Sequence, residues 1–292
     1  MQRIVLAALG LALALVTPAV GKDCDRACTL GVAEAVLEAL QSGEPGKLLP
    51  RGFRMTENGR DIRTADSQLR AFRRISYLHA FADPVSGAAG FVGAAEAYGG
   101  PAVFSMRLLL KEGRATELEA LVVRRTEASV FAPETMAGKA EWDAPLAPEQ
   151  RSNRATLLAV ANAFLDGLGS GAATTPSPEV TCGLYENGFR AIQPPTCNAI
   201  PSLRGAVLVR DRRWPVIDEE RGLAWGIAVA DIPDNADSVT GVRGARRAPR
   251  SLLISALFRI EAGKIRDIEL VQRNVPLGAV SGWAPPKPKK AR

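Results

Sequence analysis

Hydrophobic residues recur along the chain with two spacings, which alternate in the same order in both halves. A helical spacing runs through Val32, Val36 and Leu40, and again through residues 157–168. After each helical stretch come apolar runs that are separated by glycine-containing turns. The first spacing predicts an amphipathic helix and the short apolar runs predict strands. Each half is therefore expected to fold as one helix followed by a set of strands.

Capping residues bound both predicted helices. Asp23 or Asp25 can cap the first helix, and Gly43 follows its last apolar position. Ser152 or Asn153 takes the same place before the second helix. The sequence therefore places one helix near the start of each half.

The strands follow each helix as neighbours joined by short turns. We expect them at 76–82, 88–97, 102–110, 115–123, 207–217, 223–230, 252–260 and 265–272. Turn residues between adjacent runs predict antiparallel hairpins. One helix before a run of antiparallel strands predicts an α+β fold in which the helix covers one face of a sheet.

Short motifs repeat in the same order in the two halves. Residues 56–59 and 185–188 share Glu-Asn-Gly, and residues 83–87 and 218–222 share an aspartate and a glycine at fixed spacing. Asn-Gly favours a tight hairpin turn because both residues tolerate positive φ. Colinear motifs of this kind indicate two copies of one domain.

The repeat divides the chain into five segments. They are a signal peptide at 1–21, a first domain at 22–130, a linker at 131–148, a second domain at 149–276 and a flexible basic, proline-rich tail at 277–292. The two domains are expected to pack as an intramolecular pseudo-dimer.

The first residues are typical of a secretory signal peptide. Arg3 is basic, Ile4 to Val16 is apolar, and Ala19 to Gly21 offers the small residues of a cleavage site. The apolar run is too short to cross about 30 Å of hydrocarbon as a helix. We therefore expect a periplasmic or secreted protein with no membrane span after cleavage.

Composition and charge are those of an ordinary globular protein. Hydrophobic residues make up 47% and charged residues 23%, and the net charge is +6. Much of the positive charge lies in residues 243–250 and 287–292, where aromatic residues are not interleaved. The bases of a single-stranded nucleic acid would therefore find no aromatic side chains to stack on here, and no nucleic-acid partner is expected.

The four cysteines suit an exported protein with disulfides. Cys182 and Cys197 enclose the second Glu-Asn-Gly motif, and a bridge between them would stabilise the fold by about 3 kcal/mol in the chain-entropy model. Cys24 and Cys28 can also pair with each other, although four cysteines allow three connectivities. Neither pair has the spacing of a metal site, and none is expected.

The strand that ends at Asp83 carries the main candidate catalytic residues. Alternation puts Tyr77, His79, Phe81 and Asp83 on one face. His79 is the only histidine, and His79 or Asp83 could move a proton beside these rings. The alternative is structural: Asp83 caps the next turn and His79 is a satisfied strand residue.

Further candidates come from the repeat. Glu57 precedes Asn-Gly and could act as a base if burial raised its pKa, or it could bond the N–H groups of its turn. The alignment of the copies puts Arg212 at the position of Tyr77 and Trp214 at that of His79. If this face lines a pocket, the side chains that line it differ between the two copies.

Glu119 and Arg107 complete the candidate ligand-binding residues. Glu119 and Glu117 point to one face of a strand, where they could share a proton, bind a cation or pair with basic residues. Arg107 lies among apolar residues and suits an anion clamp or a buried partner of these acids. No GxSxG, HExxH, Walker or GxGxxG motif is present, so no cofactor is expected.

The motifs together resemble a secreted tandem-domain family of the nuclear-transport-factor-2-like (NTF2-like) superfamily. The resemblance rests on residues 56–59, Asp83 with Gly87, the run from Arg107 to Arg124 and their second copies, and covers nearly all of the mature chain. It implies two cones, each an N-terminal helix packed on a curved antiparallel sheet. The superfamily includes ketosteroid isomerase, SnoaL-like cyclases and binding domains, so function does not follow from fold.

Three functions stay open, and the sequence does not decide whether the protein is an enzyme. The first is an exported small-molecule-binding protein with its ligand in a cone. The second is a cofactor-free lyase, isomerase or hydrolase that uses His79 or a carboxylate. The third is a structural or interaction protein of the cell envelope. A deep pocket joining Tyr77, His79, Phe81 and Arg107 would favour the first two, and a filled cone the third.

Overall fold

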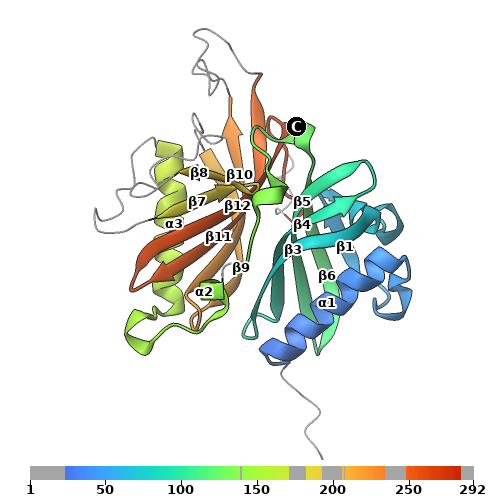
Figure 1. Cartoon of the computed structure of the whole chain (residues 1–292), viewed down its shortest axis with the longest axis horizontal. Coiled ribbons are helices and arrows are strands. Elements are labelled where there is room, and N and C mark those ends of the chain that lie inside the picture. The colour runs from blue at the N-terminus through green and yellow to red at the C-terminus, as the bar shows by residue number, and fades with distance from the viewer. Residues whose placement is uncertain are drawn as a thin grey trace, which may run out of the picture.

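The chain forms two similar six-stranded sheets with one long helix against each (Figure 1). The computed structural model describes residues 24–138, 140–170, 182–192, 206, 208–233 and 248–283. The predicted signal peptide lies outside these residues. The architecture is a two-domain, β-rich α+β protein, as the alternating spacings predict.

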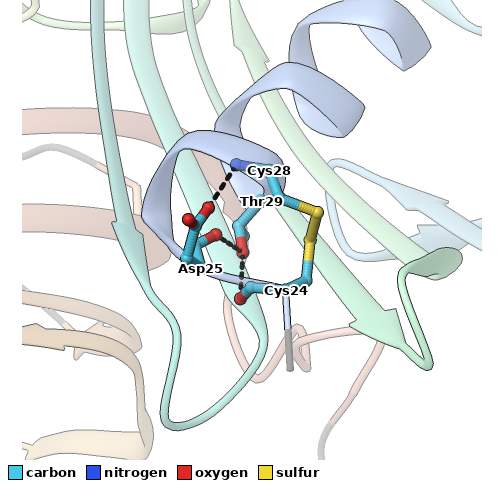
Figure 2. Close-up of a disulfide and its surroundings, with 4 residues drawn as sticks. All are labelled: Cys24, Asp25, Cys28 and Thr29. Carbon is cyan, nitrogen blue, oxygen red and sulfur yellow. Dashed lines mark hydrogen bonds between the residues drawn. A yellow bond between two sulfur atoms is a disulfide. The ribbon is translucent and has the colours of Figure 1, made fainter. Parts of the chain in front are cut away.

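The first helix, α1 (Arg26–Ser42), begins and ends at residues named from the sequence. The Asp25 carboxylate accepts the backbone N–H of Cys28 at 2.9 Å, and Gly43 ends the helix with φ of 84°. Cys24 and Cys28 form a disulfide across this first turn (Figure 2). Thr29 secures the same turn because its hydroxyl donates to the Asp25 carbonyl at 2.8 Å. The predicted Cys182–Cys197 bridge lies outside the described residues.

The strands of the first sheet are β1 (Arg54–Glu57), β2 (Arg60–Asp61), β3 (Phe72–Asp83), β4 (Ala88–Ala97), β5 (Gly100–Lys111) and β6 (Arg114–Val123). They lie in the order β2-β1-β6-β5-β4-β3. The hairpins from β3 to β6 are antiparallel, as predicted. The β1–β6 pairing is parallel, so the sheet is mixed rather than purely antiparallel.

The second half repeats this topology. Helix α3 (Arg154–Ser170), capped by Asn153, precedes β7 (Gly183–Glu186), β8 (Phe189–Ile192), β9 (Leu208–Asp218), β10 (Leu223–Ile232), β11 (Arg250–Glu261) and β12 (Lys264–Pro276). The strand order is β8-β7-β12-β11-β10-β9, and β7 is parallel to β12. Short helical turns connect the elements: Pro45–Lys47, Thr64–Asp66, Gln68–Ala71, Arg125–Glu127, Pro133–Thr135, α2 (Ala140–Asp143) and Pro148–Gln150.

The Glu-Asn-Gly motif fixes the parallel pairing. Asn58 has φ of 53° and Gly59 has φ of 79°, so both take the left-handed conformation expected of a tight turn. The Asn58 backbone N–H donates to the Ala120 carbonyl at 2.9 Å, and its side-chain oxygen accepts the Val122 N–H at 2.9 Å. Asn187 makes the equivalent bonds in the second copy. The motif therefore clamps β1 to β6 and β7 to β12.

The two sheets lie face to face between the two helices (Figure 1). Helix α1 contacts β3, β4 and β6, and α3 contacts β9, β10 and β12. A third hydrophobic core joins the inner faces of both sheets, and its members include Phe81, Val92, Trp142, Trp225, Leu253 and Leu257. Each sheet therefore uses one face for its own helix and the other for the opposite sheet.

The segments that follow β6 and β12 cross to the other half of the molecule. Ala132, after β6, donates its N–H to the Asn187 carbonyl at 2.9 Å. After β12, the Trp283 indole N–H donates to the Thr56 hydroxyl at 2.8 Å. Within the expected flexible tail, Ser281 hydrogen-bonds Arg213 of β9 and Glu119 of β6, and Trp283 bonds Thr56 of β1, so residues 281–283 are packed. Residues 284–292 lie outside the described part of the chain.

Candidate functional site

The predicted aromatic face of β3 points at the second sheet. Tyr77, His79 and Phe81 are 7%, 5% and 1% exposed. They contact residues of the opposite half and of the linker rather than α1. The space between α1 and its sheet is instead filled by large apolar side chains, among them Phe72, Phe91, Phe104, Met106, Leu108 and Leu118.

His79 lies between two carboxylates. Its Nε2 is 3.5 Å from Asp143 of α2, and its Nδ1 is 3.8 Å from Glu269 of β12. Neither ring nitrogen makes a hydrogen bond within the described residues. The ring packs edge-on against Phe81 and Trp142, at centroid distances of 5.5 and 5.4 Å. The arrangement places a buried imidazole beside an Asp143 side chain that is 67% exposed.

Tyr77 completes this cluster as a hydrogen-bond donor. Its hydroxyl donates to the Glu269 carboxylate at 3.3 Å. Burial raises the pKa of Tyr77 well above its usual range, and the negative charge of Glu269 raises it further. Tyr77 therefore stays protonated at neutral pH and holds Glu269 in place beside His79.

Arg213, rather than Trp214, occupies the position of His79 in the second copy. His79 pairs with Val92 of β4, and the equivalent Ile227 of β10 pairs with Arg213. A β-bulge in β9 between Arg213 and Val216 adds one residue and shifts the alignment predicted from the sequence. Trp214 and Arg212 contact α3 instead, where Arg212 pairs with Asp166 at 2.6 Å.

The cluster around Arg213, the counterpart of the His79 cluster, is an ion-pair network in which the Nε atoms of Arg107 and Arg213 have no hydrogen-bond partner within the described residues. Arg213 makes two hydrogen bonds to Glu119, of 2.8 and 2.7 Å. Arg107 lies 3.4 Å from the same carboxylate and donates to Glu117 at 2.9 Å. The Arg107 guanidinium also lies over the ring of Trp283. Arg107 and Glu119 therefore belong to one ion-pair network, whereas Tyr77 and His79 belong to the other cluster.

Asp83 serves the domain interface. Its Oδ1 accepts the Val85 N–H at 3.0 Å, which closes the β3–β4 turn. Its Oδ2 accepts a 2.6 Å hydrogen bond from Arg154 at the start of α3. The repeat makes the reciprocal contact, because Arg26 at the start of α1 forms a bidentate ion pair with Asp218.

Glu57 is buried beside its own hairpin. Its carboxylate accepts the Ser67 hydroxyl at 2.8 Å and the Gln68 N–H at 3.0 Å. Burial raises its pKa, and these two hydrogen bonds oppose the rise. Glu57 and Asp83 thus have structural partners and lie outside the His79 cluster.

Three clefts are described. A void of about 20 Å³ lies between the sheets, where the Ser105 and Ser255 hydroxyls are 2.6 Å apart. A polar cleft of about 490 Å³ surrounds the Arg154–Asp83 and Arg26–Asp218 pairs. The largest, about 710 Å³, is a groove beside α1 that is bounded by residues 48–50 and the β5–β6 turn. His79 lines none of the three.

The groove beside α1 is mostly apolar. Its α1 side consists of small or apolar residues, Gly31, Val32, Ala35 and Val36. Its other walls include Leu48, Leu49 and Ala115. Leu48 is 46% exposed, whereas Val36 and Ala115 are buried members of the core under α1. The groove therefore runs from solvent down to the hydrophobic core of the first domain.

Sequence reasoning missed Trp142, Asp143 and Arg213. Trp142 is fully buried although it lies in the proline-rich linker, and a tryptophan there was the available signal of docking. The position of Arg213 could not be predicted from the sequence, because residue spacing does not show the β-bulge in β9. Within the described ranges, no three His, Cys, Asp or Glu side chains gather as metal ligands would. Among the helices of these ranges, none has the length and apolarity needed to cross a membrane.

Comparison with known proteins gives one family match. The model described as "Domain of unknown function (DUF8021)" matches residues 150–271, which hold α3 and most of the second sheet. A de novo designed protein with a curved β-sheet is 14% identical, with a TM-score of 0.28, and the alignment covers 34% of this chain and 88% of that chain. AclR from Streptomyces galilaeus is 12% identical, with a TM-score of 0.27, over 35% of this chain and 82% of that chain. No curated protein matches the sequence.

Proposed function

We propose that this chain is an exported small-molecule-binding protein whose ligand lies in the groove beside α1. The observation that carries the proposal is the groove itself, an apolar depression of about 710 Å³. Ligand sites in proteins are commonly apolar clefts of about 300–1,000 Å³. We further propose that each domain is an NTF2-like cone. The interior of the first is filled by large apolar side chains, so the proposed site is the groove at its edge and not the pocket of Tyr77, His79, Phe81 and Arg107 expected from the sequence.

Export is supported by two features of the N-terminal region. The apolar leader before Cys24 is typical of a signal peptide. The Cys24–Cys28 disulfide lies at the start of α1, and such bonds persist in oxidising compartments. Cys28 also borders the groove, so the bridge holds one of its walls. These features support the proposal of a periplasmic or secreted location.

The test is to fill the groove without weakening the fold. Gly31 lies in α1, and a Cβ added there meets no atom within 4 Å. Gly31→Trp should therefore fold at least as well as the wild type, because most residues favour a helix more than glycine does. We expect the neutral apolar dye N-phenyl-1-naphthylamine to bind the wild type with enhanced fluorescence, and to bind Gly31→Trp at least tenfold more weakly.

The matched control places the same side chain elsewhere on α1. Glu38 is exposed and does not line the groove. Glu38→Trp should bind the dye as the wild type does. Equal binding by Gly31→Trp and Glu38→Trp would contradict the proposed site.

A second candidate function is a cofactor-free acid/base enzyme centred on His79. The observation that favours it is a buried imidazole between Asp143 and Glu269 with no hydrogen bond to either. His79 would exchange the proton, and Tyr77 would fix Glu269 beside it. Since His79 is the only histidine, its ring resonances can be followed by NMR without assignment ambiguity. An enzyme of this kind requires that His79 change its protonation state between pH 5 and 8. It also requires that His79→Gln abolish turnover. A His79 ring that keeps one protonation state over this pH range would contradict this second function.

A further inference from the structure

We infer that the groove beside α1 takes an anionic amphiphile, whose apolar chain lies along α1 and whose carboxylate meets Arg114. The inference rests on the proposed function and names the chemistry of its ligand. It follows from the one charged residue among those that line the groove.

Arg114 has no partner within the described residues. It begins β6 and borders the groove, and its exposed side chain makes no hydrogen bond, ion pair or ring contact there. Other arginines at clefts of this molecule are paired, as Arg26 is with Asp218 and Arg154 is with Asp83. A guanidinium can accept a carboxylate through two parallel N–H···O bonds. Arg114 therefore offers an anion site at the rim of an apolar groove.

The charges around the rim are mainly positive. Lys111 is the cross-strand neighbour of Arg114 in the β5–β6 hairpin. Arg51 follows Pro50, which lines the opposite wall. Glu112, in the same turn as Lys111, is the acidic residue closest to them in sequence. With Glu34, which is exposed on α1 next to the groove-lining Ala35, the count is three cations and two anions, and this net positive charge favours a negatively charged head group.

The floor of the groove favours an apolar chain. Val32, Val36, Leu49 and Ala115 present hydrocarbon to the cleft, and the Leu48 side chain at the rim is half exposed. Covering this surface would release about 25 cal/mol for each Å² of apolar area removed from water. A quaternary ammonium ligand would instead need aromatic rings, and none lines the groove. The combination of an apolar floor and a cationic rim selects an amphiphile with an acidic head.

The experiment compares head groups on one chain length. Decanoate, decanol and decyltrimethylammonium, each below its micelle concentration, are titrated by displacement of N-phenyl-1-naphthylamine at pH 8. We expect decanoate to bind the wild type at least tenfold more tightly than decanol, and the cationic amphiphile to bind most weakly. The preference for decanoate should shrink as salt is added, because exposed charges are screened.

Two variants locate the head group. Arg114→Gln should lose the preference for decanoate over decanol while it keeps the affinity for decanol. Arg60→Gln, which removes an exposed arginine from β2 outside the groove, should keep the preference. A preference that survives in Arg114→Gln overturns the inference.

The remaining outcomes separate the inference from the proposed function. If decanol and decanoate bind the wild type equally and both are weakened by Gly31→Trp, the groove is a ligand site but the anionic class is wrong. If none of the three amphiphiles binds and the dye is not bound either, both the inference and the proposed function fail.

Discussion

At the scale of single residues, the two Glu-Asn-Gly glycines explain why the motif occurs twice. Gly59 and Gly188 have φ of 79° and 85°. Each is also crossed by the segment that arrives from the other half of the chain. A Cβ on Gly59 would lie 2.8 Å from the Val280 carbonyl oxygen, and one on Gly188 would lie 2.2 Å from that of Ala132. Turn geometry and close approach both require glycine here.

Alanine substitutions at Gly99 and Gly188 should separate the cost of positive φ from the cost of the close backbone approach. Gly99 has φ of 84° but no atom within 4 Å of an added Cβ. Gly99→Ala should therefore lower the free energy of unfolding by about 1 kcal/mol, from backbone strain alone. Gly188→Ala adds a backbone clash and should cost about 3 kcal/mol. Urea denaturation measures both, and equal losses would contradict the crossing of the linker over this turn.

Glu57 should make stability depend on pH. Because burial raises its pKa in the folded protein, its contribution is fully present below the unfolded pKa and is lost as pH rises through the folded pKa. Glu57→Gln cannot ionise, so its stability relative to the wild type should increase between pH 4 and 7. The gain is about 1.4 kcal/mol for each unit by which the pKa is raised.

Urea denaturation at several pH values checks this sign. Asp66 provides the opposite case, because its hydrogen bond from Arg63 lowers its pKa. Asp66→Asn should keep a constant stability difference from the wild type over the same pH range, because a carboxyl with a lowered pKa is ionised throughout it. A Glu57→Gln curve parallel to that of the wild type would show that the folded carboxyl is not perturbed.

At the scale of elements, each helix start is tied to the turn of the opposite sheet. Arg154 of α3 bonds Asp83 after β3, and Arg26 of α1 bonds Asp218 after β9. Both aspartate side chains are buried, with exposed fractions of 2% and 0%. Removing Arg154 would leave the buried Asp83 carboxylate with only neutral backbone N–H donors.

Arg154→Met should therefore lower the free energy of unfolding by about 2 kcal/mol, less than a fully buried pair would because Arg154 is 34% exposed. Adding Asp83→Asn should restore part of the loss, since the unpaired charge is then gone. The control is Arg63→Met, which breaks the exposed Arg63–Asp66 pair and should leave stability unchanged. Equal effects of the two single substitutions would mean that the interdomain pair is not formed.

In this chain, local sequence patterns predict the helices, strands and hairpins well, but they predict poorly which distant strands pair. The cap at Asp25, the end at Gly43 and the hairpins from β3 to β6 all follow from neighbours in the sequence. The parallel β1–β6 pairing joins strands about 60 residues apart, which no turn signal specifies. The candidate site depended on such long-range contacts. His79 was visible as the only histidine, but Glu269 and Trp142 beside it are brought there only by packing of the two sheets.

At the scale of the whole molecule, the two halves share one core and exchange segments. The third hydrophobic core contains residues of both sheets and of the linker. The linker packs on the turn of the second sheet, and residues 281–283 contact the first. Neither half therefore keeps its buried surface when separated from the other.

The chain should accordingly unfold in a single transition. Urea denaturation followed by tryptophan fluorescence and by far-ultraviolet circular dichroism should give coincident curves, because loss of one half exposes the inner face of the other. The Arg154→Met variant should shift both curves together. Two separated transitions would show that the halves are independent domains joined by a passive linker.

If the groove beside α1 holds a small molecule, the protein purified from its host should retain that molecule. Wild type and Gly31→Trp, exported by the native host and purified in parallel, are compared by native mass spectrometry. We expect the wild type to carry the added mass of one small molecule and Gly31→Trp to have the bare polypeptide mass. A wild type with the bare polypeptide mass, or the same added mass on both proteins, would contradict a ligand site in this groove.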